Sequence, residues 1–269
     1  MNTKIEKVLN SDYIISFGSF LAQDNEQVKE AIIETIAQRN AEFIYMHPID
    51  NIDLKVFYSQ LIKYEVGSEE GIASMLLDTF AINASDKIKA YLNDLDIGYI
   101  SGESSAGEEE FEEALEKAQE KTSKVLIVGR DITTHERVEN IVKILAAINR
   151  YSDLEVICLD EKTQEQVDTC TDEDIEEVQE LDSYNGTIVY SIFDEQDCQK
   201  LVGSQSFARI AKIEDNDEVY LNYNGHKVKK QFIINEDLYG TVALCPILDS
   251  NISFLTEDYR YKQVKVEKA

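Results

Sequence analysis

The sequence predicts an α/β fold followed by a small β domain. Apolar runs of strand length alternate with helical patterns through the first two-thirds of the chain, and short strand patterns separated by turn residues follow from residue 186. The acidic stretch 161–185 between the two parts is predicted to be a linker with one short helix. Repeated strand–helix–strand units imply right-handed crossovers and a parallel sheet. We therefore expect a Rossmann-like parallel sheet with helices on both faces in residues 1–180, and a small partial barrel in residues 181–269.

Four apolar runs predict the strands of the first part. They are DYIISFG (12–18), AEFIYMHP (41–48), KVLIVGRD (124–131) and LEVICLD (154–160). The third run is continuously apolar, which is typical of a parallel strand covered on both faces. Gly18 and Gly129 end two of these runs, and ligands of such sheets bind beyond the carboxyl ends of the strands. These two glycines mark the edge where a ligand would lie.

Helical spacing of apolar residues connects the strands. Asp24-x-x-Gln27 resembles a capping box, and Val28, Ile32 and Ile36 then share one helix face. Further helices are predicted in 68–82, 85–95, 102–124 and 138–148, the last after a second capping box at Thr133-x-x-Glu136. The glutamates of 102–124 form either a docking surface or, in the simpler interpretation, a solvated helix face.

Five strand patterns predict the β domain. They are TIVYSIF (187–193), FARIAKI (207–213), EVYLNY (218–223), KVKKQFII (227–234) and TVALCPI (241–247). Asn224-Gly225 lies between the third and fourth patterns, and this dipeptide favours the type I′ turn of a β-hairpin. Several short strands with turn residues between them are typical of a partial barrel.

The charge of the chain restricts its partners. Lys and Arg total 26 against 53 Asp and Glu, a formal net charge of −27. Such a surface repels nucleic acid and anionic membranes, and it favours either solubility, which is the simpler interpretation, or a basic protein partner. No run of 18 apolar residues is present for direct membrane insertion, and MNTKIEKVLN has no apolar signal core. We expect a cytoplasmic protein that associates with a membrane only through partners.

The residues that would carry chemistry form no recognisable catalytic or metal motif. The four cysteines lack CxxC spacing and are interpreted as reduced structural thiols. The sequence contains no GxGxxG, GxxxxGK[ST] or GxSxG pattern, and the three histidines are interpreted as structural or solvent-exposed. We predict no catalytic residue and no metal ligand.

Two short loops remain as candidate ligand sites. Gly18-Ser19 and Gly129-Arg130 each follow a strand, and each glycine either eases the turn or helps an anion bind at the following helix. Arg130 either clamps that anion or pairs with one of the many carboxylates.

Three segments resemble the molybdopterin oxidoreductase superfamily. They are SDYIISFGSFLAQDNEQVKEAI, KVLIVGRDITTHERVENIVKILAAI and the region from Ser204 to Ile247. The resemblance is greatest to the carboxyl-terminal part of the large iron–sulfur subunit of bacterial respiratory NADH-quinone oxidoreductase (complex I). The cysteine-rich ferredoxin-like region of that family has no counterpart in this sequence.

This resemblance implies a function and a set of positions. It implies vestigial cofactor-binding positions at Gly18, Ser19, Gly129, Arg130 and His135, with no cofactor bound. The implied function is a non-catalytic scaffold domain that positions the electron-transfer subunits of the respiratory complex and holds no redox centre. One alternative is a shortened molybdopterin-type oxidoreductase domain that binds a pterin nucleotide, molybdopterin guanine dinucleotide. The other is a free α/β module that binds a small anion.

Overall fold

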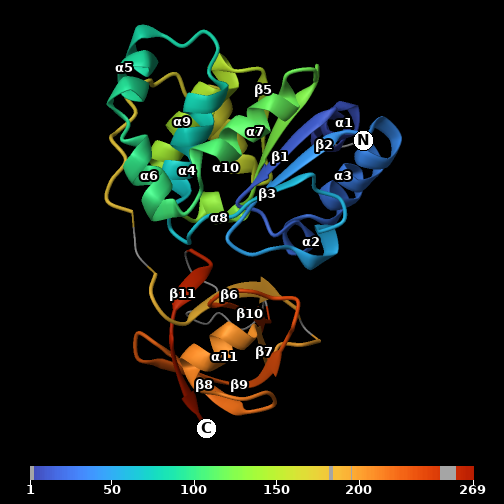
Figure 1. Ribbon diagram of the computed structural model, residues 1–269, viewed down its shortest axis with the longest axis vertical. Helices are drawn as coiled ribbons and strands as arrows, with labels where there is room; N and C mark the ends of the chain where they lie inside the picture. The colour runs from blue at the N-terminus through green and yellow to red at the C-terminus, as the bar shows by residue number, and fades with distance from the viewer. Residues whose placement is uncertain (1–2, 182–183, 195, 249–258) are drawn as a thin grey trace. The chain divides into compact units, whose positions relative to one another are not determined.

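A computed structural model describes residues 3–181, 184–194, 196–248 and 259–269 (Figure 1). The chain forms two compact units, Met1–Ser183 and Tyr184–Ala269. The first contains a parallel five-stranded sheet with helices, and the second contains a curled, mixed seven-stranded sheet that forms a half-barrel. The predicted fold class is thereby confirmed. Residues 182 and 183, near the end of the predicted linker, lie outside the described residues.

The first sheet has the strand order β3-β2-β1-β4-β5, and all its strand pairs are parallel. Its strands are β1 (Tyr13–Phe17), β2 (Glu42–Met46), β3 (Gln60–Ile62), β4 (Lys124–Val128) and β5 (Leu154–Cys158). Four of them correspond to the predicted apolar runs. The edge strand β3 was not predicted, because three residues are too few to establish an alternating pattern.

The central strand β1 sends side chains into two separate cores. Tyr13, Ile15 and Phe17 belong to a core shared with the helices α4 (Glu69–Phe80), α7 (Glu108–Ala118) and α9 (Val138–Tyr151). Ile14 belongs to a core shared with α1 (Thr3–Asn10) and α3 (Glu26–Arg39). Helices therefore cover both faces of the sheet, as predicted (Figure 1). The helices of this unit are α1 (Thr3–Asn10), α2 (Leu21–Asp24), α3 (Glu26–Arg39), η1 (Ile52–Leu54), α4 (Glu69–Phe80), α5 (Asp86–Asp94), α6 (Ile97–Ser104), α7 (Glu108–Ala118), α8 (Arg130–Thr133), α9 (Val138–Tyr151) and α10 (Glu161–Thr169).

Both predicted capping boxes are wrong. The side chain that caps α3 is Asn25, which accepts a hydrogen bond from the Val28 amide, whereas Asp24 ends the preceding short helix α2. Helix α9 begins after Arg137 with no side-chain cap, because Thr133 belongs to the separate turn of α8. A capping pattern is recognised from local sequence alone. Here a short helix, α2 after β1 and α8 after β4, comes before each long helix and shifts the start of that helix along the chain.

The second unit is built from strands in the order β11-β6-β10-β7-β9-β8-β12. They are β6 (Ile188–Phe193), β7 (Lys200–Gly203), β8 (Glu218–Tyr223), β9 (His226–Ile234), β10 (Val242–Ile247), β11 (Tyr261–Gln263) and β12 (Lys265–Lys268). Strand β10 pairs with β6 in parallel and β7 with β9 in parallel, whereas β8 pairs with β9 antiparallel, so the sheet is mixed. Asn224 and Gly225 have positive φ angles of 46° and 82°, which confirms the predicted hairpin between β8 and β9.

The predicted strand FARIAKI is wrong, because this segment is helical. Helix α11 (Gln205–Ala211) begins at Ser204, whose hydroxyl accepts a hydrogen bond from the Phe207 amide. Phe207 and Ala208 are buried in the core of the second unit, and the Phe207 ring stacks on Phe232. Seven residues with apolar side chains at mixed spacing fit either element, and the serine cap together with this packing favours a helix.

The half-buried carboxylate of Asp12 joins the starts of two neighbouring strands. It accepts hydrogen bonds from the Thr122 amide and hydroxyl and from the Ser123 amide, over distances of 2.9–3.1 Å. Burial raises the pKa of Asp12, but these hydrogen bonds outweigh burial and hold the pKa below its ordinary value. The charged carboxylate therefore fixes the turn that leads into β4.

We predict that Asp12→Ala lowers the free energy of unfolding by about 2 kcal/mol at neutral pH, because hydrogen bonds to a charged acceptor are lost. A pKa that is depressed in the folded state gives stability above the unfolded-state pKa, and this stability is lost as the pH falls through the folded-state value. Denaturant unfolding of wild type and variant at pH 7 and pH 3 measures the effect. A difference between the two proteins that stays constant over this range would contradict it.

Candidate functional site: the carboxyl edge of the parallel sheet

The loops that follow β1 and β4 contact each other through their backbones. A Cβ atom on Gly129 would lie 2.1 Å from the carbonyl oxygen of Gly18 and 2.4 Å from Cα of Ser19. Gly18 has a φ of +61°, and a Cβ there would lie 2.7 Å from Cδ1 of Ile132. Both glycines are therefore needed for close packing, and the structure brings together three of the predicted positions, Gly18, Ser19 and Gly129.

The backbone donors of these loops are used within the protein. The amide of Gly18 donates to Met46 O at 3.2 Å, and the amide of Gly129 donates to Phe17 O at 2.8 Å. The amide of Asp131 donates to Gly18 O at 3.1 Å. In a phosphate-binding loop, amides at such a position point at the ligand. Here these three amides extend the sheet and bind one loop to the other.

A carboxylate of the chain itself occupies further donors of the first loop. Oδ2 of Asp24 accepts hydrogen bonds from the Phe20 amide at 2.8 Å and from the Ser19 hydroxyl at 3.1 Å. A bound phosphate would use the same kinds of donor, a loop amide and a serine hydroxyl. The Asp24 carboxylate thus serves as an internal anion for this loop.

A buried histidine and a buried aspartate lie beside the two loops. His47 and Asp131 are both fully buried, and the distance from His47 Nε2 to Asp131 Oδ2 is 3.1 Å. His47 Nδ1 lies 3.0 Å from both the amide nitrogen and the carbonyl oxygen of Ile49, so both ring nitrogens have partners inside the protein. Asp131 was not among the predicted site residues, although it follows the strand-ending Gly129 and Arg130.

The surroundings of this edge are negative. Burial raises the pKa of the Tyr45 hydroxyl well above its ordinary value, and the nearby carboxylates of Asp131 and Asp24 raise it further. The Tyr45 hydroxyl donates to Ser19 O at 3.3 Å. The Asp24 and Asp131 carboxylates would each repel a phosphate brought close to them.

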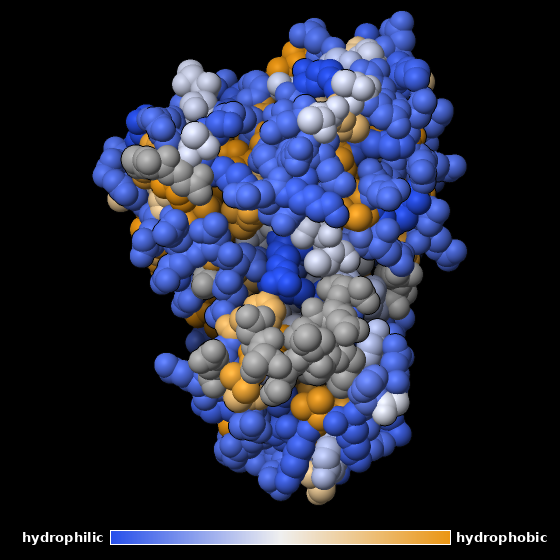
Figure 2. Space-filling model, turned by 180° about the vertical axis from the view of Figure 1, so that it is seen from behind, coloured by the Kyte–Doolittle hydropathy of each residue, from blue (hydrophilic) through white to orange (hydrophobic). Residues whose placement is uncertain are grey.

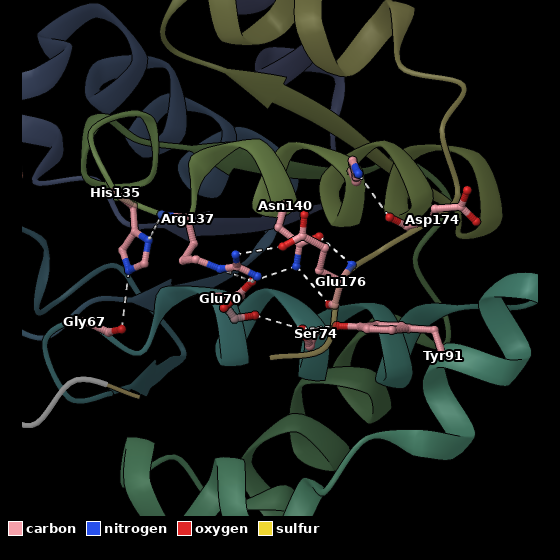
Figure 3. A network of polar contacts seen from close by, with 10 residues as sticks. Gly67, Glu70, Ser74, Tyr91, His135, Arg137, Asn140, Asp174 and Glu176 are labelled. Atoms are coloured by element: carbon pink, nitrogen blue, oxygen red, sulfur yellow. Dashed lines mark hydrogen bonds and ion pairs between the residues drawn. The ribbon is translucent and has the colours of Figure 1, made fainter. Parts of the chain in front are cut away.

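The two other predicted positions have different surroundings. Arg130 is exposed and is the first residue of α8. His135 is buried, and its Nε2 lies 3.4 Å from Gly67 O (Figure 3). The same nitrogen lies 3.5 Å from Oε2 of Glu69. His135 therefore contacts the start of α4, and its Nδ1 accepts a hydrogen bond from the Arg137 amide at 3.0 Å.

A polar network fixes an extended segment, residues 171–181, that we call the strap (Figure 3). Oε1 of the buried Glu70 accepts from Arg137 Nε at 3.1 Å and from Asn140 Nδ2 at 2.7 Å. The Asn140 side chain also accepts from the Glu176 amide at 2.8 Å and donates to Glu176 O at 3.0 Å. An asparagine side chain thus pairs with the strap backbone as a neighbouring strand would.

Two of the four cysteines, Cys158 and Cys245, are buried and have the surroundings of structural thiols. Burial raises the pKa of Cys158 to about 12 and that of Cys245 to about 11, so both thiols stay protonated at neutral pH. Within the described part of the chain, no three His, Cys, Asp or Glu side chains are grouped as a metal ion requires. Over the same residues, no helix has the length and apolar character needed to cross a bilayer.

Comparison with known proteins gives a likeness of fold. No protein-family model matches the chain, and no curated protein matches it. Among solved structures, 55 chains match. One is the acetylene hydratase from Pelobacter acetylenicus, with a TM-score of 0.52 and 7% sequence identity, over 90% of this chain and 73% of the hydratase chain. At this identity the match shows a shared fold.

We predict that Gly129→Ala lowers the free energy of unfolding by about 3 kcal/mol, because the new methyl group would overlap the backbone of Gly18 and Ser19. Gly102→Ala is the matched control. No atom lies within 4 Å of a Cβ at Gly102, which lies inside α6, so this change should be neutral or stabilising. Thermal unfolding measures both variants, and equal stability of the two would contradict the argument.

We predict that Asn140→Ala detaches the middle of the strap, because the change removes two hydrogen bonds to the backbone of Glu176 and one to Glu70. Stability should fall by about 2–3 kcal/mol. Hydrogen exchange at the Glu176 amide should become faster than in wild type. The control is Asn93→Ala on an exposed position of α5, and this variant should leave the exchange unchanged.

Proposed function

We propose that this chain is a non-catalytic scaffold module of a respiratory NADH-quinone oxidoreductase and positions electron-transfer subunits without holding a redox centre. The observation that carries the proposal is the occupied carboxyl edge of the sheet, where Asp24 takes the donors of Ser19 and Phe20. The backbone contact between Gly18 and Gly129 supports it further, because it leaves no room for even a methyl group between Gly129 and the first loop.

The fold supports the wider family assignment. The three sequence segments resemble the molybdopterin oxidoreductase superfamily, and acetylene hydratase, a member of the same family, shares the fold. The placement in a complex I subunit rests on the sequence resemblance alone.

The surface supports a role in protein association. The face shown in Figure 2 is mainly hydrophilic, and the hydrophobic areas on it are small and separate. With a net charge of −27, recognition of partners by charge is the expected mode. Such recognition suits a module that docks on basic neighbouring subunits in the cytoplasm.

The enzyme alternative is a domain that binds molybdopterin guanine dinucleotide. It is favoured by the fold likeness to an enzyme, the hydratase. Gly18-Ser19 and Gly129-Arg130 would then contact the nucleotide phosphates. The Asp24 carboxylate and the nearby Asp131 argue against it, because each would repel a phosphate at this edge.

The first test of the scaffold proposal is native mass spectrometry of the protein purified from its own cells. We expect the mass of the bare chain or of a protein complex, because the loop donors already have partners. A tightly held pterin nucleotide would overturn the scaffold proposal and support the enzyme alternative.

The second test is affinity purification of the tagged full-length chain from the membrane fraction. We expect subunits of the NADH-quinone oxidoreductase to co-purify. As a control, the intact complex is purified through another of its subunits. If that purification succeeds and none of its subunits co-purify with this chain, the assignment to that complex is wrong.

A further inference from the structure

The first unit also has a groove of about 1060 Å³, which lies on other residues than those of the carboxyl edge of the sheet. Helix α5 and the start of α6 line one side, and the strap lines the other. We propose that this groove binds a basic amphipathic helical segment of a partner protein. The inference rests on the proposed function as a scaffold and specifies the site and chemistry of one docking contact.

The floor of the groove is apolar. Its apolar side chains are half-buried and pack on their inner sides against the core that covers one face of the sheet. They are Tyr91, Leu95, Tyr99, Ile175 and Val178. Burial of such side chains by a partner provides a favourable hydrophobic contribution to binding.

The rim of the groove is strongly acidic. Seven carboxylate residues line it against a single basic residue, Lys87, which lies 2.6 Å from Asp174 in an ion pair. The seven are Asp94, Asp96, Glu173, Asp174, Glu176, Glu177 and Glu180. Across the described residues, exposed Asp94, Glu177 and Glu180 form no ion pair within 4 Å, so their charge is available to a partner.

The strap wall is held in place without a partner. Arg150 pairs with Glu173 at 3.0 Å, Lys143 donates to Asp174 O at 3.1 Å, and Asn140 pairs with the backbone of Glu176. At its end, the amide of Leu181 donates to the Tyr99 hydroxyl at 3.0 Å. A groove with fixed walls needs little ordering on binding, which favours affinity.

The arrangement favours an elongated occupant. Seven of the eight residues from 173 to 180 line the groove, so acidic and apolar groups continue along the whole wall. A compact cation would use one or two carboxylates and leave the apolar floor exposed. A helix with apolar residues at i, i+3, i+4 and i+7 and with Lys or Arg beside them matches both the floor and the rim.

A labelled synthetic peptide tests the proposal on the intact chain by fluorescence anisotropy. The peptide has about 14 residues, with leucines at helical spacing on one face and lysines elsewhere. In the groove variant, Asp94→Lys with Glu177→Lys, we expect affinity to fall at least about tenfold, because like charges now face the peptide. The control variant, Glu112→Lys with Glu116→Lys on the exposed face of α7, changes the net charge equally and should bind within about twofold of wild type.

Equal losses in the two variants would show non-specific attraction to an acidic surface and would overturn the proposal. Undiminished binding of a peptide with serines in place of the leucines would overturn it as well, because the floor would then be unused. All four substituted positions are exposed, and unchanged circular dichroism of both variants verifies their folding.

The outcome is separable from that of the proposed function. If the peptide binds in the groove but the chain does not co-purify with NADH-quinone oxidoreductase, the assignment to that complex is wrong and the groove proposal stands. If the groove variant still co-purifies with NADH-quinone oxidoreductase and the wild-type chain does not bind the peptide, the groove proposal is wrong and the scaffold proposal stands.

Discussion

The close approach of the two backbone turns after β1 and β4 determines how the carboxyl edge of the sheet packs in the first unit. Because Gly129 packs directly on Gly18 and Ser19, the two central strands are bound together beyond their last ladder hydrogen bonds. The same approach allows Ile132 to fill the space over Gly18 and helps bury Asp131 beside His47. A side chain on Gly129 would separate these elements, so the packing of the sheet edge depends on one missing Cβ atom.

The contact has a functional side as well as a structural one. In open parallel sheets, the carboxyl ends of the strands are where ligands usually bind. In this chain the same region is filled by Asp24, His47 and Asp131, each with a partner inside the protein. The acidic groove between α5, α6 and the strap lies on other elements of the unit. The polar groups at this edge of the sheet thus bind one another within the protein.

Much of the architecture could be predicted from the sequence, because it depends on local pattern. Continuous apolar runs identified β1, β2, β4 and β5, and the Asn224-Gly225 dipeptide identified a hairpin. Helix α11 was predicted as a strand, because its seven residues fit both periodicities and the packing of Phe207 on Phe232 decides between them.

The candidate site was harder to predict than the fold. Gly18 and Gly129 were found from their positions after strands, but the hydrogen bonds of Asp24 and the pairing of His47 with Asp131 join residues through tertiary contacts. His47 and Asp131 are 84 positions apart in the chain, and no motif spacing connects them. The strap shows the same limit: its composition indicated a linker, and the side chain of Asn140 makes it part of the folded unit.

The internal anion at Asp24 bears on how such a fold can change over evolutionary time. The group that satisfies Ser19 and Phe20 belongs to one side chain rather than to the backbone. Exchange of that single residue for a neutral one would expose a hydroxyl and an amide together and remove a negative charge at the same point. A single substitution at this position would therefore change the polarity of the loop after β1 while the sheet beneath it stays the same.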